Sequence, residues 1–111
     1  MAQTIAIILR FRAEEVDHFE RLFEAEVYPM WQEFKSQGKL IAASLTPVED
    51  GSETKAGVRD YILHVELPGL ADHQAFDSDP RFLSFLEKAK PLQPEKPKVW
   101  FGEPRFQILQ A

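Results

Sequence analysis

The sequence has no cysteine, only five glycines and no apolar run long enough to cross a membrane. Without cysteine, the chain has no disulfide, no thiolate metal ligand and no cysteine nucleophile. No glycine-rich phosphate loop is present, and the three histidines lack the spacing of a zinc motif. The apolar run near the start stops at Arg10, far short of the ~20 residues of a membrane span, and no signal-peptide pattern surrounds it. We therefore expect a cytoplasmic protein with no metal site and no membrane partner.

Basic residues are also in the minority. Eighteen Asp and Glu residues outnumber 13 Lys and Arg, which gives a formal net charge of −5 at pH 7. Nucleic-acid binding needs clustered Lys and Arg to neutralise phosphates, so we do not expect a nucleic-acid partner. The chain does contain 44% hydrophobic residues, including nine phenylalanines. A chain of 111 residues with this composition predicts a single folded domain over 1–111.

Hydrophobic periodicity predicts four strands and two helical regions. Apolar residues alternate in the predicted strands at 4–11, 40–48, 60–67 and 99–109, and they recur every three or four residues in the predicted helices at 13–37 and 70–90. The second helical region is expected to break at 77–79, because Asp79 is a suitable N-cap and Pro80 suits the first helical position. Pro29 is expected to kink the first helix or to start a second segment near Tyr28.

The order of these elements, β-α-β-β-α-β, predicts an α+β fold of the ferredoxin-like type. With right-handed crossovers, four antiparallel strands form one sheet and both helical regions cover one of its faces. The opposite face carries a mixture of apolar and polar side chains that is too apolar for solvent and too polar for a core. A second copy of the chain would cover this face, and we therefore expect a two-fold homodimer.

A polar cluster is predicted on that second sheet face, which we call the open face. Strand alternation places Arg10, His64, Glu66 and Arg105 on it. Since the first strand is expected to lie between the third and the last, Arg10 is predicted to reach Glu66, in competition with Arg105. We interpret the cluster mainly as structural ion pairs inside the dimer, and a functional role for these charges is the alternative.

The element order, the chain length and the segment LADHQAFDSDPRFLSFLEKAKPL at 70–92 resemble the dimeric α+β barrel superfamily. The resemblance is greatest to the antibiotic biosynthesis monooxygenase group, whose second helical region has a pattern matched here by Leu70, His73, the break at 77–80 and Phe82. It implies a homodimer that oxidises an aromatic or polyketide-like substrate without a bound cofactor, in a pocket between helices and sheet. The stress-responsive α/β-barrel proteins resemble the chain almost as well in element order, and they imply a non-catalytic dimer of unassigned function.

Haem-degrading members of the superfamily use an Asn on the first strand, a Trp near the end of the third strand and a His in the second helical region. Here the first strand has no Asn, and the third strand ends with Val65, Glu66 and Leu67. Only His73 remains of the three, so we do not expect haem chemistry.

His73 is the candidate catalytic residue. An imidazole titrates near neutral pH, so it can act as a general base or position a substrate oxygen. The alternative is a solvent-exposed histidine on a short helix. The candidate substrate-binding residues are Trp31, Tyr61, Tyr28 and Trp100, whose side chains combine an apolar body with a polar group, as an aromatic-ligand pocket requires. The alternative for each of these four is ordinary packing in a core or an interface.

Overall fold

The structure is a computed structural model that describes residues 1–109. In chain order its elements are β1 (Gln3–Arg12), η1 (Ala13–Glu15), α1 (Val16–Ser36), β2 (Ala42–Pro47), β3 (Val58–Leu67), α2 (Leu70–Ser78), α3 (Pro80–Ala89), η2 (Lys90–Leu92) and β4 (Lys98–Gly102). The predicted order of strands and helical regions is confirmed, with α2 and α3 as the two halves of the second helical region. Within residues 1–109, no helix is long and apolar enough to span a membrane.

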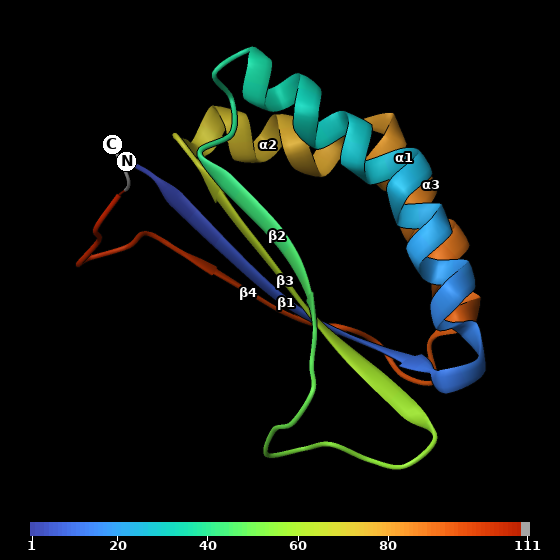
Figure 1. Ribbon diagram of the computed structural model, residues 1–111. Coiled ribbons are helices and arrows are strands. Elements are labelled where there is room, and N and C mark those ends of the chain that lie inside the picture. The colour runs from blue at the N-terminus through green and yellow to red at the C-terminus, as the bar shows by residue number, and fades with distance from the viewer. Residues whose placement is uncertain (110–111) are drawn as a thin grey trace.

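The four strands form one antiparallel sheet in the order β2-β3-β1-β4. The first strand therefore lies between the third and the last, as the ferredoxin-like arrangement requires. Figure 1 shows that α1, α2 and α3 all lie on one face of this sheet and leave the opposite face uncovered. The predicted α+β, ferredoxin-like fold is confirmed.

Alternation along the two central strands separates the buried sheet face from the open face. The fully buried apolar positions of β1 are Ile5, Ile7, Leu9 and Phe11, and the residues between them are only partly buried. The register sets Ile7 opposite the buried Leu63 of β3. Burying one such side chain contributes about 1.5–3 kcal/mol, and a one-residue slip would expose all of them. The hydrophobic pattern therefore fixes which face receives the helices.

One apolar stripe holds α1 against the sheet. Its buried side chains are Phe19, Phe23, Val27, Met30, Trp31 and Phe34. No second segment starts near Tyr28, because α1 is one continuous helix that includes Pro29. Pro29 is exposed, so water can satisfy the backbone carbonyl that its missing N–H leaves unpaired. Figure 1 shows α1 curving around the sheet.

Asp79 and Pro80 set the break between α2 and α3, as predicted. The Asp79 carboxylate accepts a hydrogen bond from the Arg81 backbone N–H at 2.8 Å, and Pro80 occupies the first turn of α3, where no N–H is needed. The Arg81 side chain pairs with Asp79 at 2.9 Å and with Glu33 of α1 at 2.5 Å. The side-chain hydrogen bond from Arg81 is the main cause that lowers the pKa of Asp79 below its ordinary value. These contacts also tie α3 to α1.

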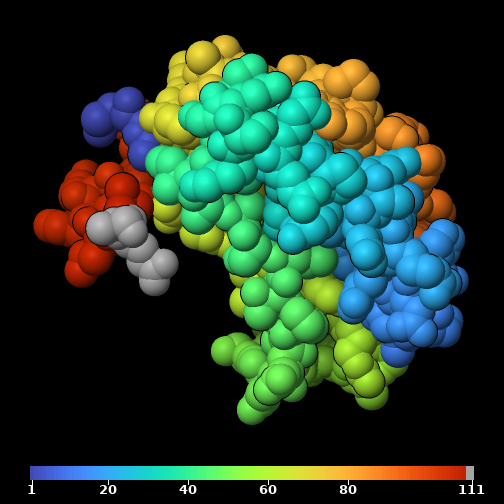
Figure 2. All heavy atoms as spheres, turned by 45° about the horizontal axis from the view of Figure 1, so that its top comes forward, coloured from blue at the N-terminus to red at the C-terminus, as the bar shows by residue number. Residues whose placement is uncertain are grey.

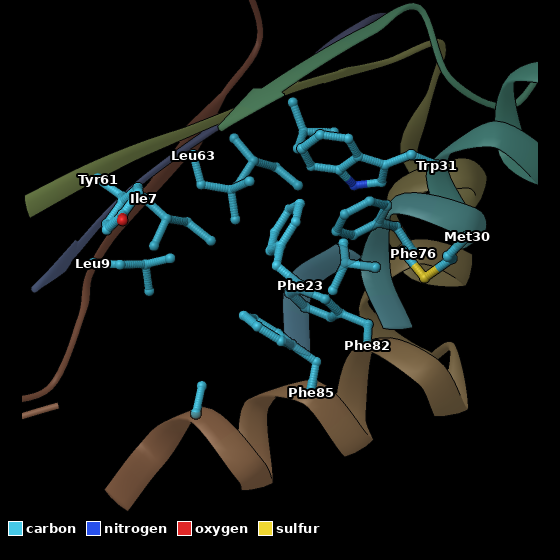
Figure 3. Close-up of a cluster of buried hydrophobic side chains, with 14 of the residues drawn as sticks. Ile7, Leu9, Phe23, Met30, Trp31, Tyr61, Leu63, Phe76, Phe82 and Phe85 are labelled. Carbon is cyan, nitrogen blue, oxygen red and sulfur yellow. The ribbon is translucent and has the colours of Figure 1, made fainter. Parts of the chain in front are cut away.

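Aromatic side chains fill most of the space between helices and sheet. Phe11 of β1 stacks on Phe19 of α1, with ring centroids 3.8 Å apart. Figure 3 shows Phe85 reaching from α3 toward Ile7 and Leu9 on the sheet. These rings do not fill all of the space between the layers, and an apolar cavity remains beside β4.

The last strand is shorter than predicted. Residues 103–109 form no strand pairing with the sheet, because Pro104, two residues past the end of β4, has no backbone N–H to donate. Phe106 and Ile108, which fall within the predicted strand at 99–109, are 92% and 99% exposed. Figure 2 shows this end of the chain, in red, projecting from the body of the molecule. The predicted strand over 99–109 is therefore wrong beyond Gly102.

Candidate functional site

An apolar cavity of about 360 Å³ lies between the sheet and the α2–α3 pair, beside the β4 edge. β1 and β3 form its floor with side chains such as Ile7 and Val65, and Phe85 of α3 forms part of the opposite wall. Val99 and Phe101 of β4 form the side wall. Both of these residues are more than half exposed, so solvent reaches the cavity along the β4 edge.

His73 and Asp77 are the only titratable residues that line this cavity, which we call the His73 cavity; all of its lining residues lie within 1–109. The two are one turn apart on α2 and project from the same side of the helix. His73 Nε2 lies 3.2 Å from Asp77 Oδ2. His73 is 8% exposed, whereas the Asp77 side chain is 59% exposed. The interpretation of His73 as a solvent-exposed side chain is therefore wrong, and its catalytic role stays a prediction.

Gln3 holds the other side of the imidazole, and the sequence reasoning missed it. Gln3 Oε1 lies 3.4 Å from His73 Nδ1, and Gln3 Nε2 donates to Glu103 Oε1 at 3.3 Å. Because a carboxylate can only accept, the amide nitrogen faces Glu103 and the amide oxygen faces His73. Both imidazole nitrogens therefore face acceptors, Gln3 on one side and Asp77 on the other. A neutral ring can donate to one of them at a time, and a protonated ring can donate to both.

A sequence signal for Gln3 did exist. By strand alternation Gln3 shares the buried face of β1 with Ile5 and Ile7, and it is 6% exposed. A buried polar side chain has to find hydrogen-bond partners, so a glutamine in this position indicates a polar group on the element packed against it. The identity of that partner, 70 positions further along the chain, depends on how α2 lies on the sheet.

The structure does not bring the four predicted aromatic residues together in one pocket, and none of them lines the His73 cavity. Tyr28 and Trp31 of α1 line a separate hollow of about 490 Å³ beside β2, which we call the α1–β2 hollow. Tyr61 is buried in the core, and Trp100 lies on the open face of β4, 58% exposed. Helix position and strand parity therefore distribute these side chains over three separate regions.

Tyr61 connects the sheet to α1. Its hydroxyl donates a hydrogen bond to the carboxylate of Glu20. Burial, followed by this hydrogen bond, raises the pKa of Tyr61 above its ordinary value. The phenol therefore stays neutral and links β3 to α1, where no ligand contact is required of it.

The predicted polar cluster on the open face is only partly formed. The antiparallel register sets Arg10 opposite Asp60 and Thr4 opposite Glu66, six positions and about 20 Å apart along β1. Arg10 therefore pairs with both oxygens of Asp60, at 2.7 and 2.9 Å, and the predicted Arg10–Glu66 pair is wrong. The hydrogen bond from Arg10 lowers the pKa of Asp60 below its ordinary value.

The other members of the predicted cluster lie near the opposite end of β3. His64 Nε2 and Glu66 Oε1 are 3.7 Å apart, and Glu66 also accepts a hydrogen bond from Gln107 at 3.0 Å. Arg105 lies beyond the end of β4 and forms no ion pair with another residue in the described part of the chain. The His64–Glu66 contact is therefore present, and neither Arg10 nor Arg105 takes part in it.

Solved structures match this architecture closely, although no protein-family model and no curated protein sequence matches the chain. A candidate antibiotic biosynthesis monooxygenase from Nitrosomonas europaea superposes with a TM-score of 0.75 at 8% identity, over 95% of this chain and 91% of that one. Another from Caulobacter crescentus gives a TM-score of 0.71 at 14% identity, over 93% and 89% of the two chains.

A dimeric ferredoxin-like protein from an uncultured marine organism gives a TM-score of 0.77 at 15% identity, over 99% of this chain and 93% of that one. This chain has the fold of these proteins. The predicted resemblance to the dimeric α+β barrel superfamily and to the antibiotic biosynthesis monooxygenase group is confirmed at the level of the fold. At such low identities the likeness extends to the fold alone, so the site has to be judged on its own residues.

Proposed function

We propose that this chain forms a homodimer that binds a flat, largely apolar aromatic molecule carrying a hydroxyl group in the His73 cavity. The observation that supports this is the lining of the cavity, which is apolar except for one His–Asp pair at one end. Small-molecule sites are typically apolar hollows of roughly 300–1,000 Å³ with a few placed polar groups, and a volume of about 360 Å³ fits that range.

The preference for a flat ring follows from the phenylalanines in the walls. Phe76, Phe82, Phe85 and Phe101 all line the cavity. Aromatic rings associate in offset-stacked or edge-on arrangements, which suit a planar ligand between them. Phe101 already stands edge-on to His73, with ring centroids 5.4 Å apart. A ring bound beside Phe101 would place its hydroxyl against the imidazole and the Asp77 carboxylate.

The same pair supports an oxidation of such a ligand. Removal of the hydroxyl proton by His73, with Asp77 beside it, gives an electron-rich phenolate that can reduce dioxygen. The balanced reaction converts a phenol and dioxygen into a quinone and water. One oxygen atom enters the ring, the other leaves as water, and the substrate supplies all four electrons, so no bound cofactor is required. This is the activity that the likeness to candidate antibiotic biosynthesis monooxygenases would mean for this chain.

The open face supports the homodimer. Ile62 and Trp100 on this face are 40% and 58% exposed, and a second copy related by a two-fold axis would cover both. Two of the matching solved structures are described as dimeric. Sedimentation equilibrium tests this directly. We expect a particle of twice the 12.8 kDa chain mass, and a stable monomer would contradict the homodimer.

Isothermal titration with 1-naphthol, followed by an oxygen-electrode assay with the same compound, tests the function. Binding with oxygen consumption would support the oxidation. Binding without oxygen consumption would support the alternative, a non-catalytic dimer of the stress-responsive type that holds the same class of ligand. Absence of 1-naphthol binding would contradict the proposed function in both its catalytic and its non-catalytic form.

A further inference from the structure

A third hollow, of about 550 Å³, adjoins the His73 cavity at the C-terminal end of α3, and we call it the lysine hollow. We infer that the ligand of the His73 cavity carries a carboxylate at the end remote from its hydroxyl, and that Lys90 and Lys96 bind this carboxylate. The inference rests on the proposed function, because it concerns a ligand in the same cavity. It adds the substrate class, an elongated hydroxylated aromatic acid.

The two spaces share part of their walls. Leu86 of α3 and Pro97, just before β4, line both of them. Strand pairing gives their order along the sheet, since Phe101, which contacts His73, lies opposite Ile5, whereas Pro97 lies at the other end of β4. The His–Asp pair therefore lies toward the Phe101 end of β4 and the lysine hollow toward the Pro97 end, and Leu86 and Pro97 border both spaces.

The lysine hollow is positively charged. Lys90 and Lys96 line it, both are exposed, and neither forms an ion pair with another residue among 1–109. The lining holds one acidic residue, Glu95, against these two lysines, and Glu95 also pairs with Arg10, with Nη1 and Oε1 3.1 Å apart. The lining of this hollow is therefore positively charged, although the net charge of the chain is −5. An anionic group is the natural complement of the two lysines.

The length of the space sets the length of the ligand. Lys90 comes eight positions after Phe82, just past the end of α3, and eight residues of helix span about 12 Å. The floor between Ile5 and Leu9 of β1 is about 13 Å long by the rise of a strand. A ligand that reaches from the His–Asp pair to the lysines therefore needs about three fused aromatic rings between its hydroxyl and its carboxylate.

Fluorescence titration with anthracene-2-carboxylate and its uncharged amide, anthracene-2-carboxamide, tests the inference. We expect the acid to bind the wild-type protein about five- to tenfold more tightly than the amide, which is the size of effect for two exposed ion pairs. The double variant Lys90→Gln/Lys96→Gln should lose this preference. The control Lys39→Gln/Lys55→Gln removes the same charge from exposed positions outside the hollow and should keep it.

The remaining outcomes separate the two proposals. Equal binding of acid and amide, or a preference for the acid that survives Lys90→Gln/Lys96→Gln, would overturn the inference and leave the proposed function standing. The same holds if 1-naphthol binds and neither anthracene compound does, because the two spaces would then not act as one. If none of the three compounds binds, the proposed function fails and the inference fails with it.

Discussion

The two edges of the sheet border hollows of different character. At the β4 edge, the His73 cavity is apolar, and its one histidine, on α2, is buried. At the β2 edge, the α1–β2 hollow is more open to solvent, and Glu20, Glu24 and the half-exposed Tyr28 line it. An enclosed apolar wall removes ligand surface from water and strengthens each hydrogen bond inside, whereas an open acidic hollow leaves both hydrated. The greater enclosure, more than the number of aromatic residues, is the reason for proposing the ligand site at the β4 edge rather than at the β2 edge.

The largest expected effect is a difference in the free energy of unfolding between variants in the walls of the two hollows. Phe85→Ala removes a ring that is 1% exposed, lines the His73 cavity and packs edge-on against Phe23. We expect the free energy of unfolding to fall by about 3–5 kcal/mol, measured by urea denaturation. Tyr28→Ala, at the edge of the other hollow, should change it by less than about 1 kcal/mol. Similar losses for both variants would mean that the two walls are equally part of the core.

The next effect concerns His73, which lines the cavity at the β4 edge and has no counterpart in the α1–β2 hollow. Gln3→Leu removes the acceptor at His73 Nδ1, so the Nε2–H tautomer, which donates to Asp77, should become the main neutral form. Nitrogen-15 NMR of the ring measures this change, and we expect about 1–2 kcal/mol of lost stability beside it. Gln74→Leu, an exposed site on α2, is the matched control and should leave the ring signals in place. Unchanged ring signals in Gln3→Leu would show that Gln3 does not orient His73.

Ligand binding sharpens the comparison further. Asp77→Asn removes the charge of the polar pair in the His73 cavity, and we expect 1-naphthol to bind about tenfold more weakly in isothermal titration. Glu24→Gln makes the same change of charge in the α1–β2 hollow and should leave the affinity unaltered. A larger loss from Glu24→Gln than from Asp77→Asn would reverse the assignment of the site.

The sequence allowed a prediction of the fold because its signals are local. Alternation in β1 and the Asp79–Pro80 pair depend on neighbouring residues, and both predictions are confirmed. Contacts across the molecule depend on register and helix placement. Arg10 pairs with Asp60 because the register of β1 and β3 sets these two residues opposite each other, and alternation within each strand does not determine that register. The sequence likewise did not show which edge of the sheet Tyr28 and Trp31 would face, so it did not reveal that the four aromatic residues lie in separate regions.

The smallest expected effect is on stability at low pH. It concerns the ion pairs of Arg81 with Asp79 and Glu33, which join α3 to α1. The pKa of Asp79 is lowered in the folded protein, chiefly by Arg81, which also binds Glu33 of α1. A lowered pKa means that the ionised carboxylate stabilises the fold above pH 3.8, its ordinary pKa, and that this contribution is lost as the pH falls below that value. Asp79→Asn keeps the cap, so it should cost about 0.5–1 kcal/mol at pH 7, and the difference from wild type should vanish near pH 2. A difference that persists unchanged at pH 2, by urea denaturation, would contradict this origin.

The most direct test of the central claim, that the ligand site is the His73 cavity, is an NMR titration with 1-naphthol that observes both hollows in one sample. His73 ring signals and the backbone amides of Ile5 and Phe101 report on the cavity, and the Trp31 indole N–H reports on the α1–β2 hollow. We predict that the His73, Ile5 and Phe101 signals shift with a common dissociation constant while the Trp31 signal stays in place. A shift of the Trp31 indole with unmoved His73 signals would contradict the account.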